Sequence, residues 1–157
     1  MPLIYKTIGQ ILDENAGKYS NQTAVVYVDE NIRFSWFELK DRVDMAAKAF
    51  IALGVKKGKH IAIWGTNKPE WLITQLAAAK IGAGLVTINP EWKANELEYA
   101  LKQSDSKVLV MIEGFEKKSG DKLHRYEYLK ILIDACPEIV DVKDKERLAT
   151  EAQRTQR

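Results

Sequence analysis

Cysteine is almost missing from this sequence, and its scarcity limits the chemistry open to the chain. Cys136 is the one cysteine among 157 residues, so no disulfide can form within the chain. The two histidines, His60 and His124, lie far apart in the sequence and complete no ligand set for a structural zinc. We expect Cys136 to be a small buried apolar residue on a helix, and each histidine to be a surface or packing residue.

Long apolar runs are also missing. Hydrophobic residues make up 46% of the chain, which is enough for a core. The longest apolar stretch, residues 71–88, is interrupted by Thr74, Gln75, Lys80 and two glycines, whereas a membrane-spanning helix needs about 20 apolar residues in a row. We therefore expect no transmembrane segment. The first residues show neither a signal-peptide pattern nor an Arg- and Ser-rich leader, which predicts a cytoplasmic protein.

No single sign of charge dominates. The formal net charge is +2, and the 29% of residues that are charged are spread along the chain with both signs mixed. A nucleic-acid-binding protein needs a basic stripe that displaces counterions from phosphate groups. We therefore expect no nucleic-acid partner.

The motifs that usually carry catalysis are lacking as well. The sequence has no G-x-S-x-G nucleophile elbow, no H-E-x-x-H zinc motif and no G-x-x-x-x-G-K-S/T phosphate loop. Gly82 and Gly84 end a helix and enter a strand, which is the reverse of the order in a dinucleotide-binding loop. Residues 65–67 do lie between a strand and a helix N-terminus, where backbone N–H groups can meet an anion. With one glycine and a self-sufficient cap at Asn67, a structural turn is the favoured interpretation.

Two other groups of side chains invite a functional interpretation and are better explained structurally. Asp13 and Glu14 are adjacent on an expected helix and point about 100° apart, so they favour two solvated carboxylates over an acid/base pair. Trp64, Trp71 and Trp92 favour packing of helices on a sheet over an aromatic pocket. The sequence thus predicts no catalytic residue, no cofactor-binding residue and no metal ligand in this chain.

Hydrophobic periodicity organises the first third of the chain. Thr7, with Gln10 three residues later, predicts a capped short helix that weakens at Gly17. Residues 24–28 and 32–34 are β-branched and aromatic, and the polar residues 29–31 between them predict a hairpin. Ser35 and Glu38 form a second capping-box pattern, which predicts an amphipathic helix that ends before Gly54.

Strands and helices then alternate. Apolar strands are expected at residues 61–64, 85–88 and 107–112, with helices from Asn67, capped with Glu70 three residues later, to Ile81 and over 94–103. A polar loop containing Gly114 and Gly120 precedes a helix expected over about 126–136. Connections of this length imply right-handed βαβ units. The sequence therefore predicts an α/β fold: a parallel, doubly wound sheet with helices on both faces, plus a short N-terminal β-hairpin.

Residues 1–142 are expected to form one α/β subdomain. Residues 143–157 are rich in charge and contain few apolar side chains, so we expect a charged tail or connector with low order.

A longer pattern adds what composition does not supply. Residues 61–71, 74–82, 88–90 and 95–101, in this order and spacing, resemble the N-terminal block of AMP-forming acyl-CoA synthetases, the adenylate-forming family. The similarity is greatest to fatty-acid:CoA ligases of the acyl-CoA synthetase family member 2 type. Residues 35–39 and 53–58 resemble two earlier segments of that family. Lys59, where the family usually has an acidic residue, and Gly65-Thr66, where its members tend to have Ala-Pro, are departures that leave the fold unaffected.

The resemblance implies a two-step reaction for the full-length family. A fatty-acid carboxylate attacks the α-phosphate of ATP, with Mg²⁺, to give an acyl-adenylate, and the CoA thiol then displaces AMP. The family's Ser/Thr/Gly-rich triphosphate loop, its Tyr-Gly-x-Thr-Glu motif and its C-terminal lysine do not occur in this sequence, which resembles about the first quarter to third of a member. No catalytic residue can be carried over, and we expect the chain alone to bind neither ATP, Mg²⁺ nor CoA and to be inactive as a ligase.

Two other functional classes stay open at this stage. The chain can be a non-enzymatic assembly module that pairs through an exposed apolar face, with itself as a homo-oligomer or with a full-length synthetase. It can also be a nucleotide-binding doubly wound domain in its own right, which requires a glycine-rich loop directly after a strand. Gly65 is the one glycine that meets that condition.

Overall fold

The computed structural model describes residues 5–137 and 139, which form two compact units. The first unit contains the described residues up to 90 together with 100–112, and the second contains 91–99 with the described residues from 113 onward. The expected tail at 143–157 lies outside the described residues. None of the described helices is long and apolar enough to cross a membrane.

The first two helices begin where the sequence predicts. Helix α1 (Ile8–Tyr19) has Thr7 as its N-cap, and the Thr7 and Gln10 side chains each bond the other residue's backbone N–H. Helix α2 (Trp36–Ala52) starts in the same way, because Ser35 N–H donates to Glu38 Oε2 at 2.8 Å and Glu38 N–H donates to Ser35 Oγ at 3.2 Å. These reciprocal bonds satisfy N–H groups that a helix start leaves unpaired, so both capping-box predictions are confirmed.

The predicted hairpin between these helices is also present. Strands β1 (Thr23–Tyr27) and β2 (Ile32–Ser35) pair antiparallel, with Tyr27 opposite Ile32. Asn31 in the connecting turn has φ 53°, a left-handed conformation that asparagine tolerates better than most residues.

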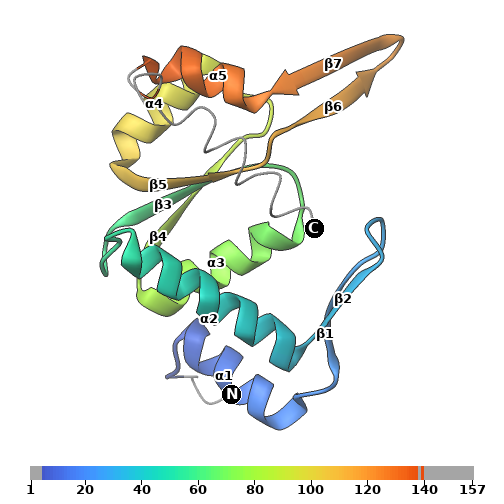
Figure 1. Ribbon diagram of the computed structural model, residues 1–157, viewed down its shortest axis with the longest axis vertical. Coiled ribbons are helices and arrows are strands. Elements are labelled where there is room, and N and C mark those ends of the chain that lie inside the picture. Colours follow the sequence, from blue (N-terminus) through green and yellow to red (C-terminus); the bar gives the residue numbers. More distant parts are fainter. Residues whose placement is uncertain (1–4, 138, 140–157) are drawn as a thin grey trace. The chain divides into compact units, whose positions relative to one another are not determined.

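Three parallel strands form the sheet of the first unit, in the order β4-β3-β5 (Figure 1). Strand β3 (His60–Trp64) is central, β4 (Gly84–Ile88) follows helix α3 (Pro69–Ile81), and β5 (Ser106–Met111) follows helix α4 (Ala94–Ser104). The first crossover leads from the central strand β3 to β4, and the second leads in the opposite direction, from β4 past β3 to β5. Because such connections are right-handed, α3 and the C-terminal part of α4, residues 100–104, lie on opposite faces of the sheet. This is the doubly wound arrangement that the sequence predicts.

The order of the strands explains their unequal burial. All of β3 except His60 is buried, whereas most residues of β4 and β5 are half-buried. The expectation of three buried strands is therefore correct for the central one alone. Each outer strand has one unpaired edge among the described strands, and edge strands expose their side chains more than central ones.

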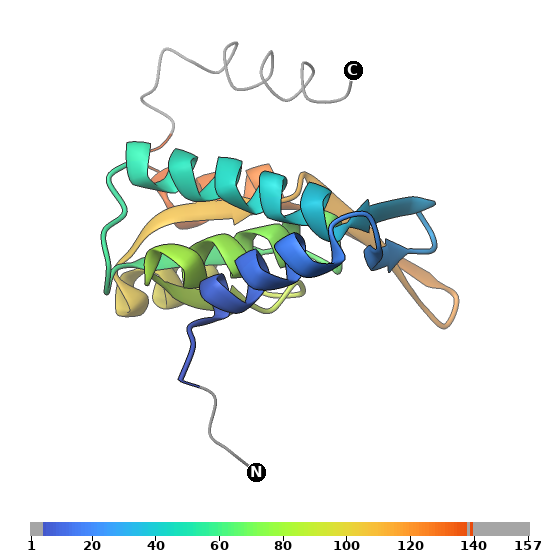
Figure 2. The same ribbon diagram turned by 90° about the horizontal axis from the view of Figure 1, so that it is seen from below.

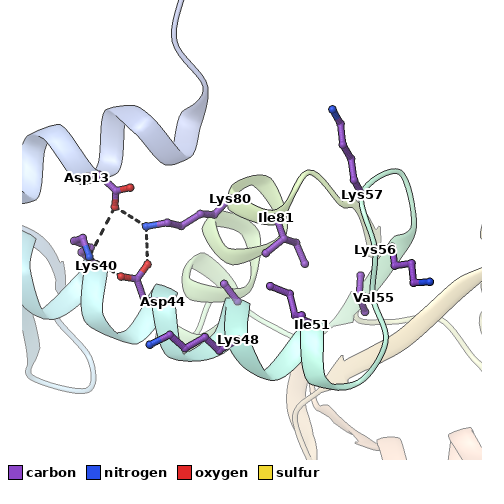
Figure 3. A pocket seen from close by; sticks show the side chains of 11 residues that line it. Asp13, Lys40, Asp44, Lys48, Ile51, Val55, Lys56, Lys57, Lys80 and Ile81 are labelled. Atoms are coloured by element: carbon purple, nitrogen blue, oxygen red, sulfur yellow. Dashed lines mark hydrogen bonds and ion pairs between the residues drawn. The ribbon is translucent and has the colours of Figure 1, made fainter.

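Helices α1, α2 and α3 pack against one another within the first unit, as both ribbon views show (Figures 1 and 2). Lysines and aspartates from all three form a charge cluster (Figure 3). Lys80 Nζ lies 2.5 Å from Asp13 Oδ1 and 2.6 Å from Asp44 Oδ1, and Lys40 Nζ lies 2.5 Å from Asp44 Oδ2. Asp13 and Glu14 are both exposed, as expected for solvated carboxylates, and they pair with different lysines: Glu14 Oε2 accepts from Lys6 Nζ at 2.7 Å, whereas Asp13 belongs to the charge cluster.

The charge cluster predicts a pH dependence of stability. Burial raises the pKa of Asp44, but hydrogen bonds from Lys40 and Lys80 outweigh burial and hold it below the ordinary 3.8. A carboxyl whose pKa is lower when folded stabilises the protein above its unfolded pKa, and this contribution is lost as pH falls through the folded pKa. Asp44→Asn should therefore cost about 1 kcal/mol at neutral pH in urea unfolding, and its deficit should shrink below about pH 4.

Asp41→Asn is the matched control for this experiment. Asp41 is exposed on the same helix and makes no ion pair with the described residues, so its replacement should change the free energy of unfolding by no more than about 0.5 kcal/mol. A deficit of Asp44→Asn that stays constant down to the acid limit would show that lost packing, and not lost charge pairing, is responsible.

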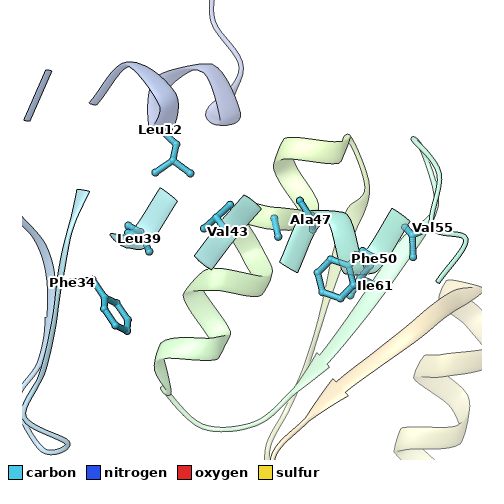
Figure 4. Close-up of a cluster of buried hydrophobic side chains, with 10 residues drawn as sticks. Leu12, Phe34, Leu39, Val43, Ala47, Phe50, Val55 and Ile61 are labelled. Atoms are coloured by element: carbon cyan, nitrogen blue, oxygen red, sulfur yellow. The ribbon is translucent and has the colours of Figure 1, made fainter. Parts of the chain in front are cut away.

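The hydrophobic core of the first unit lies between these helices and the sheet (Figure 4). Val43 and Ile61 are completely buried, and Leu12 and Leu39 are nearly so. Burying one such side chain contributes about 1.5–3 kcal/mol, so this cluster is the main source of stability in the unit. The other buried members are Phe34, Ala47, Phe50, Val55, Ala77 and Ala78.

The second unit corrects one prediction. Residues 114–127, expected to be a polar loop running into a helix, form an antiparallel hairpin of β6 (Gly114–Ser119) and β7 (Lys122–Glu127). Helix α5 (Tyr128–Ala135) is correspondingly shorter than expected, and Cys136 is its half-buried C-cap instead of a buried helical residue. The turn is Gly120-Asp121, with φ 59° at Gly120, and a two-residue turn of this kind matches the twist of a hairpin.

Candidate functional site

The carboxyl edge of the parallel strands is the place to look for a site, because doubly wound sheets bind ligands beyond the carboxyl ends of their strands. Three segments of the first unit meet there. Residues 65–67 follow β3, Asn89 and Pro90 follow β4, and Ile112 follows β5.

Trp64 ties the ends of two strands together at this edge. Its side chain is completely buried, and its Nε1–H donates to the backbone oxygen of Asn89 at 3.1 Å. An indole N–H has one hydrogen to donate and is costly to bury unbonded, so this contact both permits the burial of Trp64 and fixes the exit of β4. The prediction that Trp64 packs within the fold and does not line an aromatic pocket agrees with this geometry.

Gly65 allows the chain after β3 to approach Ile112, which follows β5, closely. A Cβ atom built on Gly65 would lie 3.3 Å from Cγ2 of Ile112, and Ile112 N–H donates to Trp64 O at 3.4 Å. The space beside Gly65 is therefore taken by an apolar side chain. A phosphate loop needs its glycines to leave room for the ligand, and the room here is filled by Ile112.

The start of α3 differs from the expected one. The helix begins at Pro69 with Lys68 as N-cap, and no side chain caps it, so the predicted capping box of Asn67 and Glu70 is wrong. Proline holds φ near the helical value and excludes the preceding residue from the helical region, which fixes the first helical position at Pro69.

This start leaves few N–H groups for an anion. Pro69 has none, and Trp71 N–H donates to Lys68 O at 2.9 Å. The negatively charged Glu70 also occupies the first turn of α3, where it already interacts with the positive end of the helix dipole.

The electrostatics of this edge are set by an ion pair between the hairpin and the helix. Lys68 Nζ lies 2.6 Å from Glu30 Oε1. The hydrogen bond from Lys68 lowers the pKa of Glu30, and the same bond raises the pKa of Lys68. Burial, followed by the charges of Glu70 and Glu30, raises the pKa of Tyr27. Lys68 is thus neutralised by a carboxylate, and these surroundings do not suit a polyphosphate.

The other candidate side chains do not converge. His60 begins β3 in the first unit, where its ring lies against Gly84, and His124 lies opposite Lys117 in the β6–β7 hairpin of the second unit. Among the described residues, no group of three or more His, Cys, Asp or Glu side chains could hold a metal ion. Gly82, at the end of α3, has φ 72°, the left-handed cap that stops a helix, as the sequence analysis expected.

Comparison with known proteins places these features in context. A family model described as AMP-binding enzyme matches residues 12–156. The Bacillus subtilis (strain 168) protein YngI, whose name assigns it to the acyl-CoA synthetases, is 40% identical, and the match covers 83% of this chain and 27% of YngI. The bovine (Bos taurus) medium-chain acyl-CoA ligase ACSF2, mitochondrial, is also 40% identical, over 85% of this chain and 20% of that protein. The chain thus spans about a quarter of the length of these relatives.

Solved structures give the same pattern. The N-terminal domain of FACL13 from Mycobacterium tuberculosis matches 68% of this chain and 27% of that chain with a TM-score of 0.65 and 30% identity. The anthranilate CoA ligase AuaEII, solved in complex with anthranoyl-AMP, matches 71% of this chain and 21% of that chain with a TM-score of 0.63 and 27% identity.

Proposed function

This chain belongs to the AMP-binding enzyme family, as the N-terminal part of its AMP-forming acyl-CoA ligases, and on that premise we propose that it is the scaffold portion of a fatty-acid:CoA ligase. In this role it contributes no group to the chemistry. Its sheet and helices support the polypeptide that binds ATP, Mg²⁺, CoA and the fatty acid.

The observation that carries the proposal is the filled carboxyl edge of the sheet. Ile112 occupies the space beside Gly65, Pro69 removes a donor from the start of α3, and Glu30 neutralises Lys68. A site for a nucleoside triphosphate needs converging hydrogen-bond donors and positive charge, and the residues described at this edge supply neither. No catalytic, cofactor-binding or metal-binding residue is therefore assigned to the chain.

The chain's own contribution is rigidity. The bond from Trp64 to Asn89 and the contact of Gly65 with Ile112 hold the exits of all three parallel strands in a fixed relation. Reacting groups lose much of their effect when they are misplaced by about 1 Å, so a rigid platform below a catalytic site contributes to rate without touching substrate.

Complementation tests the proposal directly. The purified chain, mixed with medium-chain fatty acid, ATP and Mg²⁺, should give no exchange of pyrophosphate into ATP. Bovine ACSF2 from which the segment matched by this chain has been deleted should also be inactive. Co-expression of the two pieces should restore exchange above either piece alone. Clear turnover by this chain alone would overturn the proposal.

An assembly role is the second candidate, favoured by large apolar side chains that α2 and its C-cap expose. Phe37, Met45, Ile51 and Leu53 are each more than half exposed. Surfaces of this kind often mark contacts with other polypeptides. Size-exclusion chromatography with light scattering separates the candidates, since a monodisperse dimer supports pairing of two copies and a monomer supports the scaffold role.

Cytoplasmic location is part of the proposal. The bovine relative is named as mitochondrial, so imaging of a fluorescent fusion of the full coding region is a real test, and a mitochondrial signal would overturn this part.

A further inference from the structure

A groove in the first unit lies away from the edge described above. It has a volume of about 790 Å³ and is lined by α2, the end of α3, residues 55–57, which precede β3, and Asp13 of α1. The end of α3 and residues 55–57 lead into the amino ends of the parallel strands. The groove is therefore at the opposite edge of the sheet from the carboxyl ends and is independent of the proposed scaffold role.

The groove carries an excess of positive charge. Five lysines and two aspartates line it, and the two aspartates are engaged by Lys40 and Lys80 in the charge cluster. The remaining three, Lys48, Lys56 and Lys57, are exposed and form no ion pair with any residue that the structure describes. Three uncompensated positive charges therefore surround this groove.

The floor of the groove is apolar. Ala47, Ile51, Val55 and Ile81 line it, and Ile51 is 58% exposed. The aliphatic stem of Lys57 lies against Gly82 at one rim of the groove, since a Cβ atom built on Gly82 would be 3.0 Å from Lys57 Cγ. The result is a hydrophobic floor with ammonium groups around it.

The directions of the three lysines restrict the occupant. Figure 3 shows Lys48, Lys56 and Lys57 pointing apart, one from α2 and two from the loop before β3. Because the three ammonium groups point in different directions, carboxylates spaced along a chain suit them better than a single phosphate group does. An acidic polypeptide with an apolar side chain fits both the charges and the floor.

We propose that this groove binds an acidic amphipathic segment of a partner protein. The apolar side chain of the segment lies on Ile51 and Ile81, and its carboxylates pair with Lys48, Lys56 and Lys57. Because these pairs are exposed, the affinity falls as salt is added.

Fluorescence anisotropy on the full 157-residue chain tests this assignment. The probe is a labelled synthetic peptide with glutamates on one helical face and leucines on the other, and the comparison peptide has lysine in place of glutamate. Lys48→Glu, Lys56→Glu and Lys57→Glu together should weaken binding of the acidic peptide about tenfold or more. Ile51→Ser, which adds no charge, should weaken it by about fivefold through the floor alone.

The matched control reverses Lys118, Lys122 and Lys130, three exposed lysines of the second unit, and should change the affinity by less than about threefold. Circular dichroism verifies that each variant folds. The proposal fails if the acidic peptide does not bind, if the lysine peptide binds equally well, or if the control loses as much affinity as the groove variant. It also fails if inorganic pyrophosphate displaces the peptide at equal concentration, or if phosphatidylglycerol vesicles bind through the same lysines while the peptide does not.

Discussion

Trp64→Ala should lower the free energy of unfolding by about 3–5 kcal/mol, one of the largest single effects expected in this chain. The side chain is completely buried in the central strand, so its removal loses apolar burial and leaves a cavity that the surrounding strands fill only in part. The backbone oxygen of Asn89 also loses the indole donor. Urea unfolding followed by far-UV circular dichroism measures the loss without depending on tryptophan fluorescence.

Two further variants separate the contributions. Trp64→Phe keeps most of the ring volume and removes the donor to Asn89, so it should cost about 1–2 kcal/mol for the hydrogen bond and the smaller ring. Trp71→Ala removes a half-buried indole from α3 and should cost clearly less than Trp64→Ala. Equal losses for the two alanine variants would contradict the central position of Trp64.

Local signals in the sequence identify much of this fold. Capping boxes at Thr7 and Ser35 depend on side chains three residues apart, and no distant part of the chain is needed to form them. The parallel sheet follows from the lengths of the crossovers, because a helix between two strands leaves few other arrangements.

Two predictions that the structure corrects, the polar loop at 114–127 and the cap of α3, also have local causes. The β6–β7 hairpin has charged residues on much of its surface, so alternation of apolar and polar side chains is weak and the Gly120-Asp121 turn was the one clear signal. At the start of α3 the restriction imposed by Pro69 outweighs the capping pattern of Asn67 and Glu70.

The half-burial of β4 and β5 could not be predicted from composition. Strand order decides which strand is central, and order depends on contacts between segments far apart in the chain.

The candidate site illustrates the same division. The sequence placed Gly65 between a strand and a helix, but the contact with Ile112 joins residues 47 positions apart and became visible in three dimensions alone. The pairing of Lys68 with Glu30 likewise joins a helix start to a hairpin 38 positions earlier. The lysine-rimmed groove collects residues from three helices and a loop, so no sequence window contains it.

Gly114→Ala should destabilise the second unit by about 2–4 kcal/mol. Gly114 has φ 152°, and a Cβ atom there would lie 2.0 Å from the backbone oxygen of Tyr126. Because the obstacle is backbone, rotation of a side chain cannot relieve it, and the base of the β6–β7 hairpin must open. Opening also disturbs the stacked pair of Phe115 and Tyr126, whose ring centroids are 4.6 Å apart. Native-state hydrogen exchange of the β6 and β7 amides measures the effect locally.

Gly120→Ala is the control at the other end of the same hairpin. Gly120 also has a positive φ, 59°, but a Cβ atom there meets nothing within 4 Å. Its replacement should therefore cost about 1–2 kcal/mol, the strain of the left-handed conformation alone. The difference between the two variants isolates the clash with Tyr126. If both substitutions speed amide exchange to the same extent, the close approach at Gly114 contributes nothing, and the hairpin is limited by its turn.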